Sequence, residues 1–253
     1  MKKDKYALGL VSVSFRQHSP KEILEVTKAA GLSCIEWGSD VHAPCHDIER
    51  LHKIAEMQKE YGIFCSSYGT YFRLGETPIE ELSDYIAAAK ALGTDILRLW
   101  GTRKSGKDMT EEERKDLLEL CRTVAKIAED SGVTFCLECH KNTFTENPDD
   151  AVWLMQSIRS PRFRMYWQPF QWRTAEENET YAKAIAPYVR HVHVFQWKRD
   201  DKFSLREGIE EWQRYLACLP DHGALLLEFM PNGGLNELTA EADALREIIG
   251  GNV

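Results

Sequence analysis

The sequence has no apolar run close to the roughly 18 residues that a membrane-spanning helix needs. It also has no tract of basic residues, and its net charge of −8 makes nucleic acid and anionic membranes poor partners. The sequence contains neither a Gly-rich phosphate-binding loop nor the Ser, His and Asp motifs of a hydrolase catalytic triad. These absences favour a protein that acts on a small molecule, with neither nucleic acid nor membrane as a partner.

The cysteines do not suggest a disulfide framework. There are seven, an odd number, scattered through predicted strands and helices, which is typical of a reducing compartment. Near the start, apolar residues alternate with Ser and Gly and run into Arg16, Gln17 and His18 without a cleavage-like site. We therefore expect a first strand there rather than a signal peptide, and a cytoplasmic protein.

The order of predicted elements indicates the fold. The 253 residues, 43% of them apolar, are enough to bury a large core. Short β-rich runs alternate with helical periodicity and begin near residues 6, 33, 63, 95, 133, 162, 190 and 224. This spacing predicts an α/β fold, a single (β/α)8 TIM barrel spanning residues 1–253 as one domain. Capping boxes at Thr77–Glu80, Thr110–Glu113 and Thr174–Glu177 predict three helix starts. Segments 101–109 and 197–205 are expected to be longer loops.

Two carboxylates stand out at the C-terminal strand ends, the catalytic face of such a barrel. Glu138 and Glu228 each end an otherwise apolar strand, where a buried carboxylate is costly unless it is paired or binds a cation. A structural ion pair with Arg98 is one explanation, and a functional site is the other. His191 and His193 share a face of the seventh strand, with His193 nearer the rim. Oxygen and imidazole together suit Mn²⁺, Co²⁺, Mg²⁺ or Zn²⁺.

The segments at these strand ends carry a resemblance to a known family. They are Ile35–His42, Leu137–His140, Tyr166–Pro169, His191–Phe195, Leu205–Gly208 and Leu227–Phe229. In them the chain resembles the xylose isomerase-like TIM barrels, which include sugar isomerases, ketose 3-epimerases, hydroxypyruvate isomerase, inosose dehydratase and apurinic endonucleases. The likeness covers nearly the whole chain, and it is greatest to the group called sugar phosphate isomerase/epimerase.

The resemblance implies a metal site. The epimerases hold one divalent ion with Glu, Asp, His and Glu from strands five to eight, and the matching positions here are Glu138, Gln168, His193 and Glu228. Because Gln168 stands where the epimerases have Asp, one anionic ligand is missing and we expect weaker metal binding. Gln171 likewise replaces a His.

The activity implied by the resemblance is a metal-dependent ketose isomerase or epimerase, in which Glu138 and Glu228 transfer a proton through an enediolate. Two alternatives stay open: a lyase or dehydratase acting on keto-sugars or keto-glycosides, and a barrel that binds a sugar without turnover. The negative charge and the missing ligands disfavour an apurinic endonuclease. Such barrels often form dimers or tetramers, so a homo-oligomer is compatible with the resemblance. The predicted substrate contacts are Trp37, His42, Tyr68, Arg98, Trp100, His140, Gln171, Trp197 and Arg199.

Overall fold

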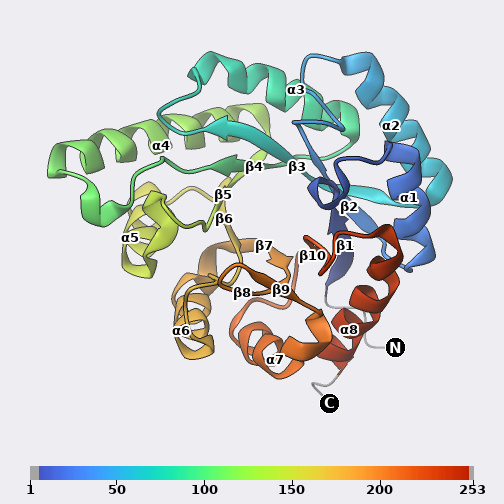
Figure 1. Cartoon of the computed structure of the whole chain (residues 1–253). Helices are drawn as coiled ribbons and strands as arrows, with labels where there is room; N and C mark the ends of the chain where they lie inside the picture. The colour runs from blue at the N-terminus through green and yellow to red at the C-terminus, as the bar shows by residue number, and fades with distance from the viewer. Residues whose placement is uncertain (1–5, 251–253) are drawn as a thin grey trace.

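Eight parallel strands close into a barrel in the computed structural model, which describes residues 6–250 (Figure 1). The barrel strands are β1 (Ala7–Val11), β2 (Cys34–Gly38), β3 (Phe64–Arg73), β4 (Ile96–Trp100), β5 (Thr134–Glu138), β6 (Phe163–Trp167), β7 (Val189–Val194) and β10 (Ala224–Leu227). The helices around them are α1 (Pro20–Ala29), α2 (Ile48–Tyr61), α3 (Leu82–Leu92), α4 (Glu111–Ser131), α5 (Pro148–Ile158), α6 (Ala175–Ile185), α7 (Ile209–Cys218) and α8 (Leu238–Gly250). The predicted (β/α)8 barrel is confirmed. None of the helices in the described residues is long and apolar enough to cross a membrane.

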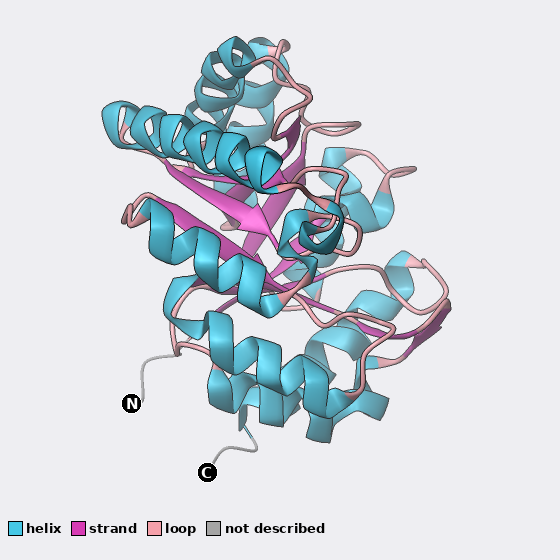
Figure 2. Ribbon diagram, turned by 90° about the vertical axis from the view of Figure 1, so that its left-hand side faces the viewer, coloured by secondary structure: helices cyan, strands magenta, loops and turns pink. Residues whose placement is uncertain are grey.

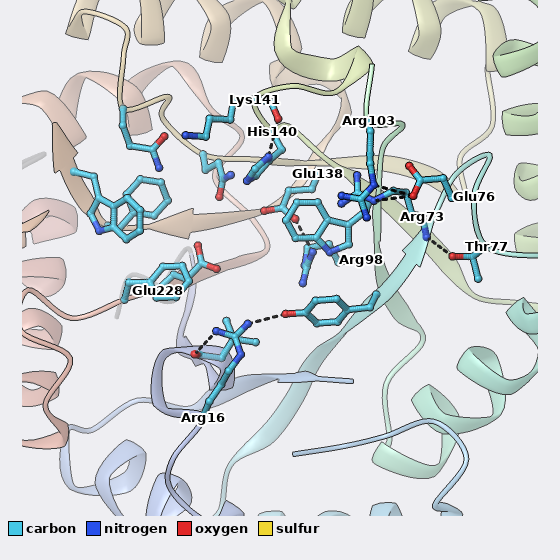
Figure 3. A pocket seen from close by; sticks show the side chains of 18 residues that line it. Arg16, Arg73, Glu76, Thr77, Arg98, Arg103, Glu138, His140, Lys141 and Glu228 are labelled. Atoms are coloured by element: carbon cyan, nitrogen blue, oxygen red, sulfur yellow. Dashed lines mark hydrogen bonds and ion pairs between the residues drawn. The ribbon is translucent and has the colours of Figure 1, made fainter. Parts of the chain in front are cut away.

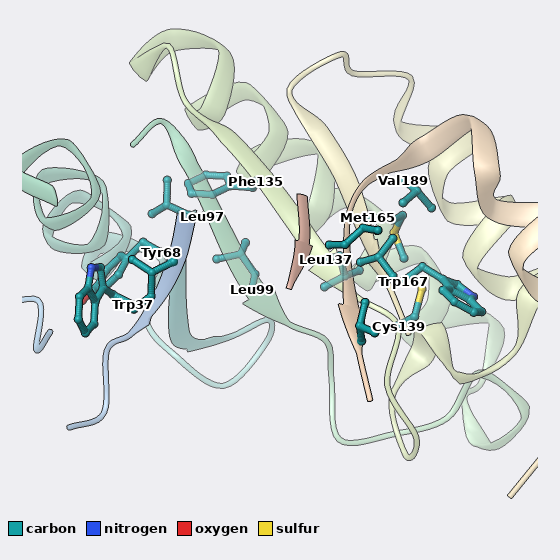
Figure 4. Close-up of a cluster of buried hydrophobic side chains, with 14 of the residues drawn as sticks. Trp37, Tyr68, Leu97, Leu99, Phe135, Leu137, Cys139, Met165, Trp167 and Val189 are labelled. Atoms are coloured by element: carbon teal, nitrogen blue, oxygen red, sulfur yellow. The ribbon is translucent and has the colours of Figure 1, made fainter. Parts of the chain in front are cut away.

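Alternation along the strands separates two apolar cores. On β5, Phe135 and Leu137 point outward into the large cluster between strands and helices (Figure 4). Cys136, between them, belongs to a second cluster that joins residues of six barrel strands and therefore fills the barrel interior. Its members are Val11, Val13, Cys34, Ile96, Cys136, Tyr166, Ala224 and Leu226. The next inward position on β5 is Glu138, so the interior changes from apolar to charged toward the C-terminal strand ends.

Two of the three predicted capping boxes form. Thr110 and Thr174 each accept a hydrogen bond from the backbone N–H three residues later, at the starts of α4 and α6. Thr77 does not cap a helix, because its hydroxyl accepts a hydrogen bond from the backbone N–H of Arg73 at 3.0 Å. A short 3-10 turn, Ile79–Glu81, follows, and α3 begins only at Leu82.

A small antiparallel hairpin replaces the loop expected after the seventh strand. It consists of β8 (Gln196–Lys198) and β9 (Asp201–Phe203), joined by a two-residue turn in which Arg199 has φ of 58°. The hairpin forms a separate two-stranded sheet outside the closed barrel (Figure 2). It places Trp197 beside Phe229, with ring centroids 5.2 Å apart, at the end of the barrel where the charged residues gather.

Candidate metal and active site

A cavity of about 600 Å³ opens at the C-terminal ends of the barrel strands (Figure 3). Residues from most of the strand ends and the loops after them line it. Its floor contains Glu138, Gln168 and Glu228, which follow or end β5, β6 and β10. The predicted ligands of three strands therefore do reach one cavity, because parallel strands end on the same rim.

Arg98 bridges two buried carboxylates beneath this floor. Its Nη1 donates to Oε2 of Glu138 at 2.5 Å, and its Nε donates to Oε1 of Glu36, on β2, at 3.0 Å. Gly69 on β3 leaves the space for this pair, since a Cβ there would lie 2.6 Å from Oε1 of Glu36. The ion pair considered from the sequence thus exists for Glu138.

His193 lies between the same carboxylates and Glu228. Its Nε2 is 3.4 Å from Oε2 of Glu36, while its Nδ1 is 3.6 Å from Oε1 of Glu138 and 3.5 Å from Oε2 of Glu228. The ring is 1% exposed. A proton on Nε2 that points to Glu36 leaves the lone pair of Nδ1 facing the other two carboxylates.

Burial and neighbouring charges give the carboxyls different proton affinities. Burial opposes ionisation of Glu138, but the guanidinium of Arg98 outweighs it and holds the pKa at about 2. Burial raises the pKa of Glu228 to about 7. The charge of His193 lowers this pKa, and the charge of Glu138 raises it. Burial would lower the pKa of His193, yet the carboxylates of Glu228 and Glu36 raise it to about 10. Together they form a buried cluster with excess negative charge.

The donor set fits a divalent cation. The oxygen Oε1 of Gln168 and the nitrogen Nδ1 of His193 are buried and make no hydrogen bond within residues 6–250. Two ligands about 2.1 Å from one tetrahedral ion stand about 3.4 Å apart, close to the separations of Nδ1 from Glu138 and Glu228. If a cation displaces the proton of Nδ1 and leaves His193 neutral, the three buried carboxylates against the one guanidinium leave two negative charges, which a divalent ion would balance. No three His, Cys, Asp or Glu side chains of the described residues form a metal-binding group by themselves, so a metal site here would need the amide oxygen of Gln168 as a further ligand.

The predicted substrate contacts divide into two sets. Five of them line the cavity: Arg98, Trp100, His140, Gln171 and Trp197. Trp37, His42 and Tyr68 do not. Trp37 donates to Oε1 of Gln58 and Tyr68 to the carbonyl of Ala43, both at 2.5 Å, and His42 lies buried between Ser12 and the carbonyl of His18. Trp37 and Tyr68 pack in the core between strands and helices and do not line the cavity.

Arg199 also lies elsewhere. As the turn residue of the β8–β9 hairpin it donates its backbone N–H to the carbonyl of Gln171 at 2.9 Å. The residue lines a second cavity of about 320 Å³, between the hairpin and the loop after β6. Arg199 is thus absent from the lining of the cavity at the strand ends, and a contact with the substrate stays a prediction.

Glu36 is the main residue that the sequence analysis missed. It stands two residues after Cys34 on β2, so the period of two along a strand would have placed it inside the barrel like Glu138. The cavity also contains Arg16, Tyr71, Arg73, Arg103 and Lys141, which come from loops and strand extensions. No local pattern in the sequence places these residues on the rim.

A (β/α)8 barrel with carboxylates, an amide and an imidazole gathered at the C-terminal strand ends belongs to a broad class of barrels with a polar site in this place. Within that class, the sequence profile described as "Xylose isomerase-like TIM barrel" matches residues 24–248. The chain belongs to the xylose isomerase-like TIM barrel family.

Individual relatives are distant. A 3-dehydroshikimate dehydratase from Bacillus anthracis is 20% identical over 199 residues, which are 75% of this chain and 70% of the relative. The structure of the probable 3-DHS dehydratase AsbF from the same organism has a TM-score of 0.80 at 17% identity, covering 94% of this chain and 98% of that one.

Two further solved structures differ in what they bind. The IOLI protein with a zinc atom has a TM-score of 0.77 at 13% identity, covering 98% of this chain and 99% of that one. D-psicose 3-epimerase with D-tagatose, from Clostridium cellulolyticum H10, has a TM-score of 0.65 at 15% identity, covering 96% and 98%. At such identities these structures show a shared fold.

Proposed function

We propose that the protein is a divalent-metal-dependent enzyme that moves a proton next to the carbonyl group of a small sugar-like substrate. The observation that carries the proposal is that Glu138, Gln168, His193 and Glu228 gather around one cavity floor. Two of their buried atoms that could bind a metal, Oε1 of Gln168 and Nδ1 of His193, make no hydrogen bond within residues 6–250. A divalent ion held by these four residues would supply Lewis acidity, which stabilises negative charge on a carbonyl oxygen. The zinc in the related IOLI structure agrees with such an ion.

Glu228 is the group best suited to carry the proton. Without a bound ion, burial raises its pKa to about 7, well above that of Glu138, so of the two carboxyls it is the one that holds a proton more readily and can both accept and donate one. Glu138 is held ionised by Arg98 at 2.5 Å, and it therefore serves as a ligand and a fixed charge. Epimerisation at one carbon calls for acid–base groups on both faces of that carbon. A single mobile proton favours transfer between adjacent carbons, which is isomerisation.

Other side chains of the cavity suit a sugar-like compound. Trp100 and Trp197 provide aromatic walls for its apolar faces, and the ring of His140 packs 4.7 Å from that of Trp100. The amide of Gln171 lines the same space and can bond hydroxyl groups.

Elimination of water is the second candidate, and the dehydratase relative favours it specifically. The same arrangement would serve, because Glu228 can take the proton from the carbon beside the carbonyl and give it to the departing hydroxyl group. That transfer releases one water molecule and leaves a conjugated double bond. Isomerisation, by contrast, releases no water and keeps the molecular formula of the substrate.

The test begins with the metal. Protein purified without chelator or nickel is expected to hold about one divalent ion per chain, and His193→Gln is expected to lose it. His52→Gln, an exposed position on α2, is the matched control and should keep the ion. A wild-type chain that binds no Mn²⁺, Co²⁺, Mg²⁺ or Zn²⁺ at millimolar concentration would contradict the proposal. Incubation of the loaded enzyme with keto-sugars in D₂O then separates the two reactions: deuterium at carbon indicates isomerisation, and new ultraviolet absorbance indicates elimination.

A further inference from the structure

The rim of the cavity is cationic in a chain that is acidic overall. Against a net charge of −8 for the protein, five cationic and three carboxylate side chains line this space. The cations are Arg16, Arg73, Arg98, Arg103 and Lys141, and the carboxylates are Glu76, Glu138 and Glu228. A divalent ion on the floor would balance the buried carboxylates there, so these would not offset the cations of the rim.

Two of the five cations are already neutralised. Arg98 is enclosed between Glu36 and Glu138, as described above. Arg16 donates from Nε to Oδ2 of Asp40 at 2.5 Å. The positive charge available to a ligand is therefore on Arg73, Arg103 and Lys141.

Arg73 and Arg103 share a single carboxylate. Oε2 of Glu76 lies 2.9 Å from Nε of Arg103 and 3.9 Å from Nε of Arg73, so one positive charge is left on this side of the cavity (Figure 3). Arg73 is also fixed in place, because its Nη1 donates to the carbonyl of Gly101 at 2.7 Å and its guanidinium lies 4.9 Å from the ring centre of Trp100. Burial and the charge of Arg103 both lower the pKa of Arg73, a sign that like charges are crowded here.

Lys141 adds charge from another part of the rim. Its Nζ lies 3.6 Å from the ring centre of Trp172, and it makes no ion pair with any residue in the range 6–250. Crowded cations around a cavity raise its affinity for an anion, and the planar fork of an arginine matches a carboxylate or phosphate group.

We propose that the substrate of this site is an anion, a sugar-like carbonyl compound whose carboxylate or phosphate group binds Arg73 and Arg103. The proposal rests on the proposed function only in taking this cavity as the substrate site. The anionic group would lie beside Trp100, on the rim, and the carbonyl end would point toward the floor that holds Glu138 and Glu228. Neutral ketoses would lack the group that the two arginines are placed to bind.

The experiment compares three probes that differ at one carbon: D-glucose, D-glucuronate and D-glucose 6-phosphate. Binding of each to the metal-loaded full chain is measured by calorimetry at low ionic strength. We expect at least one of the two anions to bind about tenfold more tightly than glucose, as one charge-assisted hydrogen-bonded pair allows. The tighter of the two anions identifies the group as carboxylate or phosphate. Equal binding of all three probes would overturn the proposal.

Variants locate the preference. Arg73→Gln combined with Arg103→Gln is expected to remove the preference for the anion while glucose binds as before. Arg103→Gln alone should weaken it and is safe for folding, because that side chain is 72% exposed. Arg122→Gln on α4 removes one positive charge, as Arg103→Gln does, but at a residue that does not line the cavity, and it should leave the preference unchanged. A preference that survives in the folded double variant would place the anion at the metal instead, and would overturn the role of the arginines.

The result is independent of the reaction, since binding needs no turnover. A chain that holds the metal but binds glucose best would overturn the anionic substrate alone. A chain that holds no metal but keeps an arginine-dependent preference for the anion would overturn the proposed function alone.

Discussion

His193 and Glu36 face each other inside the barrel, with Nε2 of the imidazole 3.4 Å from Oε2 of the carboxylate. Glu36 is itself held in place, because Ser67 donates a hydrogen bond to the same oxygen at 2.9 Å and Arg98 binds the other at 3.0 Å. A carboxylate behind an imidazole fixes the proton on the nitrogen that it faces, and it makes the opposite nitrogen a better ligand. Here that opposite nitrogen is Nδ1, which points at Glu138 and Glu228.

We therefore expect Glu36→Gln to weaken metal binding about 10- to 100-fold, the usual effect of losing such a partner. The amide keeps the size of the side chain but removes the negative charge that holds the proton on Nε2 of His193. Titration of Zn²⁺ into the metal-free protein checks the affinity, and circular dichroism checks that the variant folds. Ser67→Ala, which removes one hydrogen bond to Glu36 but no charge, should have a much smaller effect. Unchanged affinity in folded Glu36→Gln would show that Glu36 does not orient His193.

Gln168→Asp is expected to tighten metal binding. The substitution replaces a neutral oxygen ligand with an anionic one at the end of β6, which strengthens the attraction for a divalent cation. Titration of Zn²⁺ into the metal-free wild-type and variant proteins measures the effect. An unchanged affinity in the folded variant would mean that the side chain of residue 168 is not a ligand.

The sequence predicted the barrel well because its signals are local and repeated. All eight predicted strand starts agree with the structure within one residue, as at Phe64 and Ile96. Glu138 and Glu228 were recognised because a carboxylate at the end of an apolar strand is unusual. Trp37 and Tyr68 were predicted to line the pocket from their strand-end positions alone; the period of two places Trp37 on the face opposite Glu36, toward the helices.

Contacts across the barrel could not be read from the sequence. The bridge that Arg98 makes between β2 and β5 joins residues 62 and 40 positions apart in the chain. The pairing of Arg73 and Arg103 at the rim could not be read from the sequence either, because it depends on the ion pairs that both make with Glu76. Such groupings depend on loop conformations, for which residue spacing carries little information.

Gly69→Ala should destabilise the protein by about 1–3 kcal/mol, the usual cost of overpacking a core. Its added methyl carbon would lie 2.6 Å from Oε1 of Glu36 and 3.0 Å from Nη2 of Arg98, and both groups are held in place by their ion pair. Urea unfolding measures the change. In a Glu36→Asp background the shorter side chain withdraws from residue 69, so the same substitution should cost less. An equal cost in the two backgrounds would contradict the proposed contact.

His191 makes the stability of the fold depend on pH. It is buried on β7, two residues before His193 and on the same face of the strand. Its Nδ1 accepts a hydrogen bond from the backbone N–H of Ala224 at 2.8 Å, and its Nε2 lies 3.3 Å from the carbonyl of Ser66. Burial lowers its pKa to about 3, so the unfolded chain takes up a proton that the folded chain resists. Its contribution is therefore complete above about pH 6.5 and is lost as the pH falls toward 3.

Between pH 7 and pH 4 this one residue is expected to remove about 3 kcal/mol of stability. His191→Gln keeps an acceptor and a donor but cannot take up the proton, so its free energy of unfolding should fall less over the same interval. Urea unfolding of both proteins at pH 7, 5.5 and 4 tests this, because all other titrating groups contribute to both and cancel in the comparison. Equal losses in the wild type and the variant would mean that the imidazole is not kept neutral by the fold.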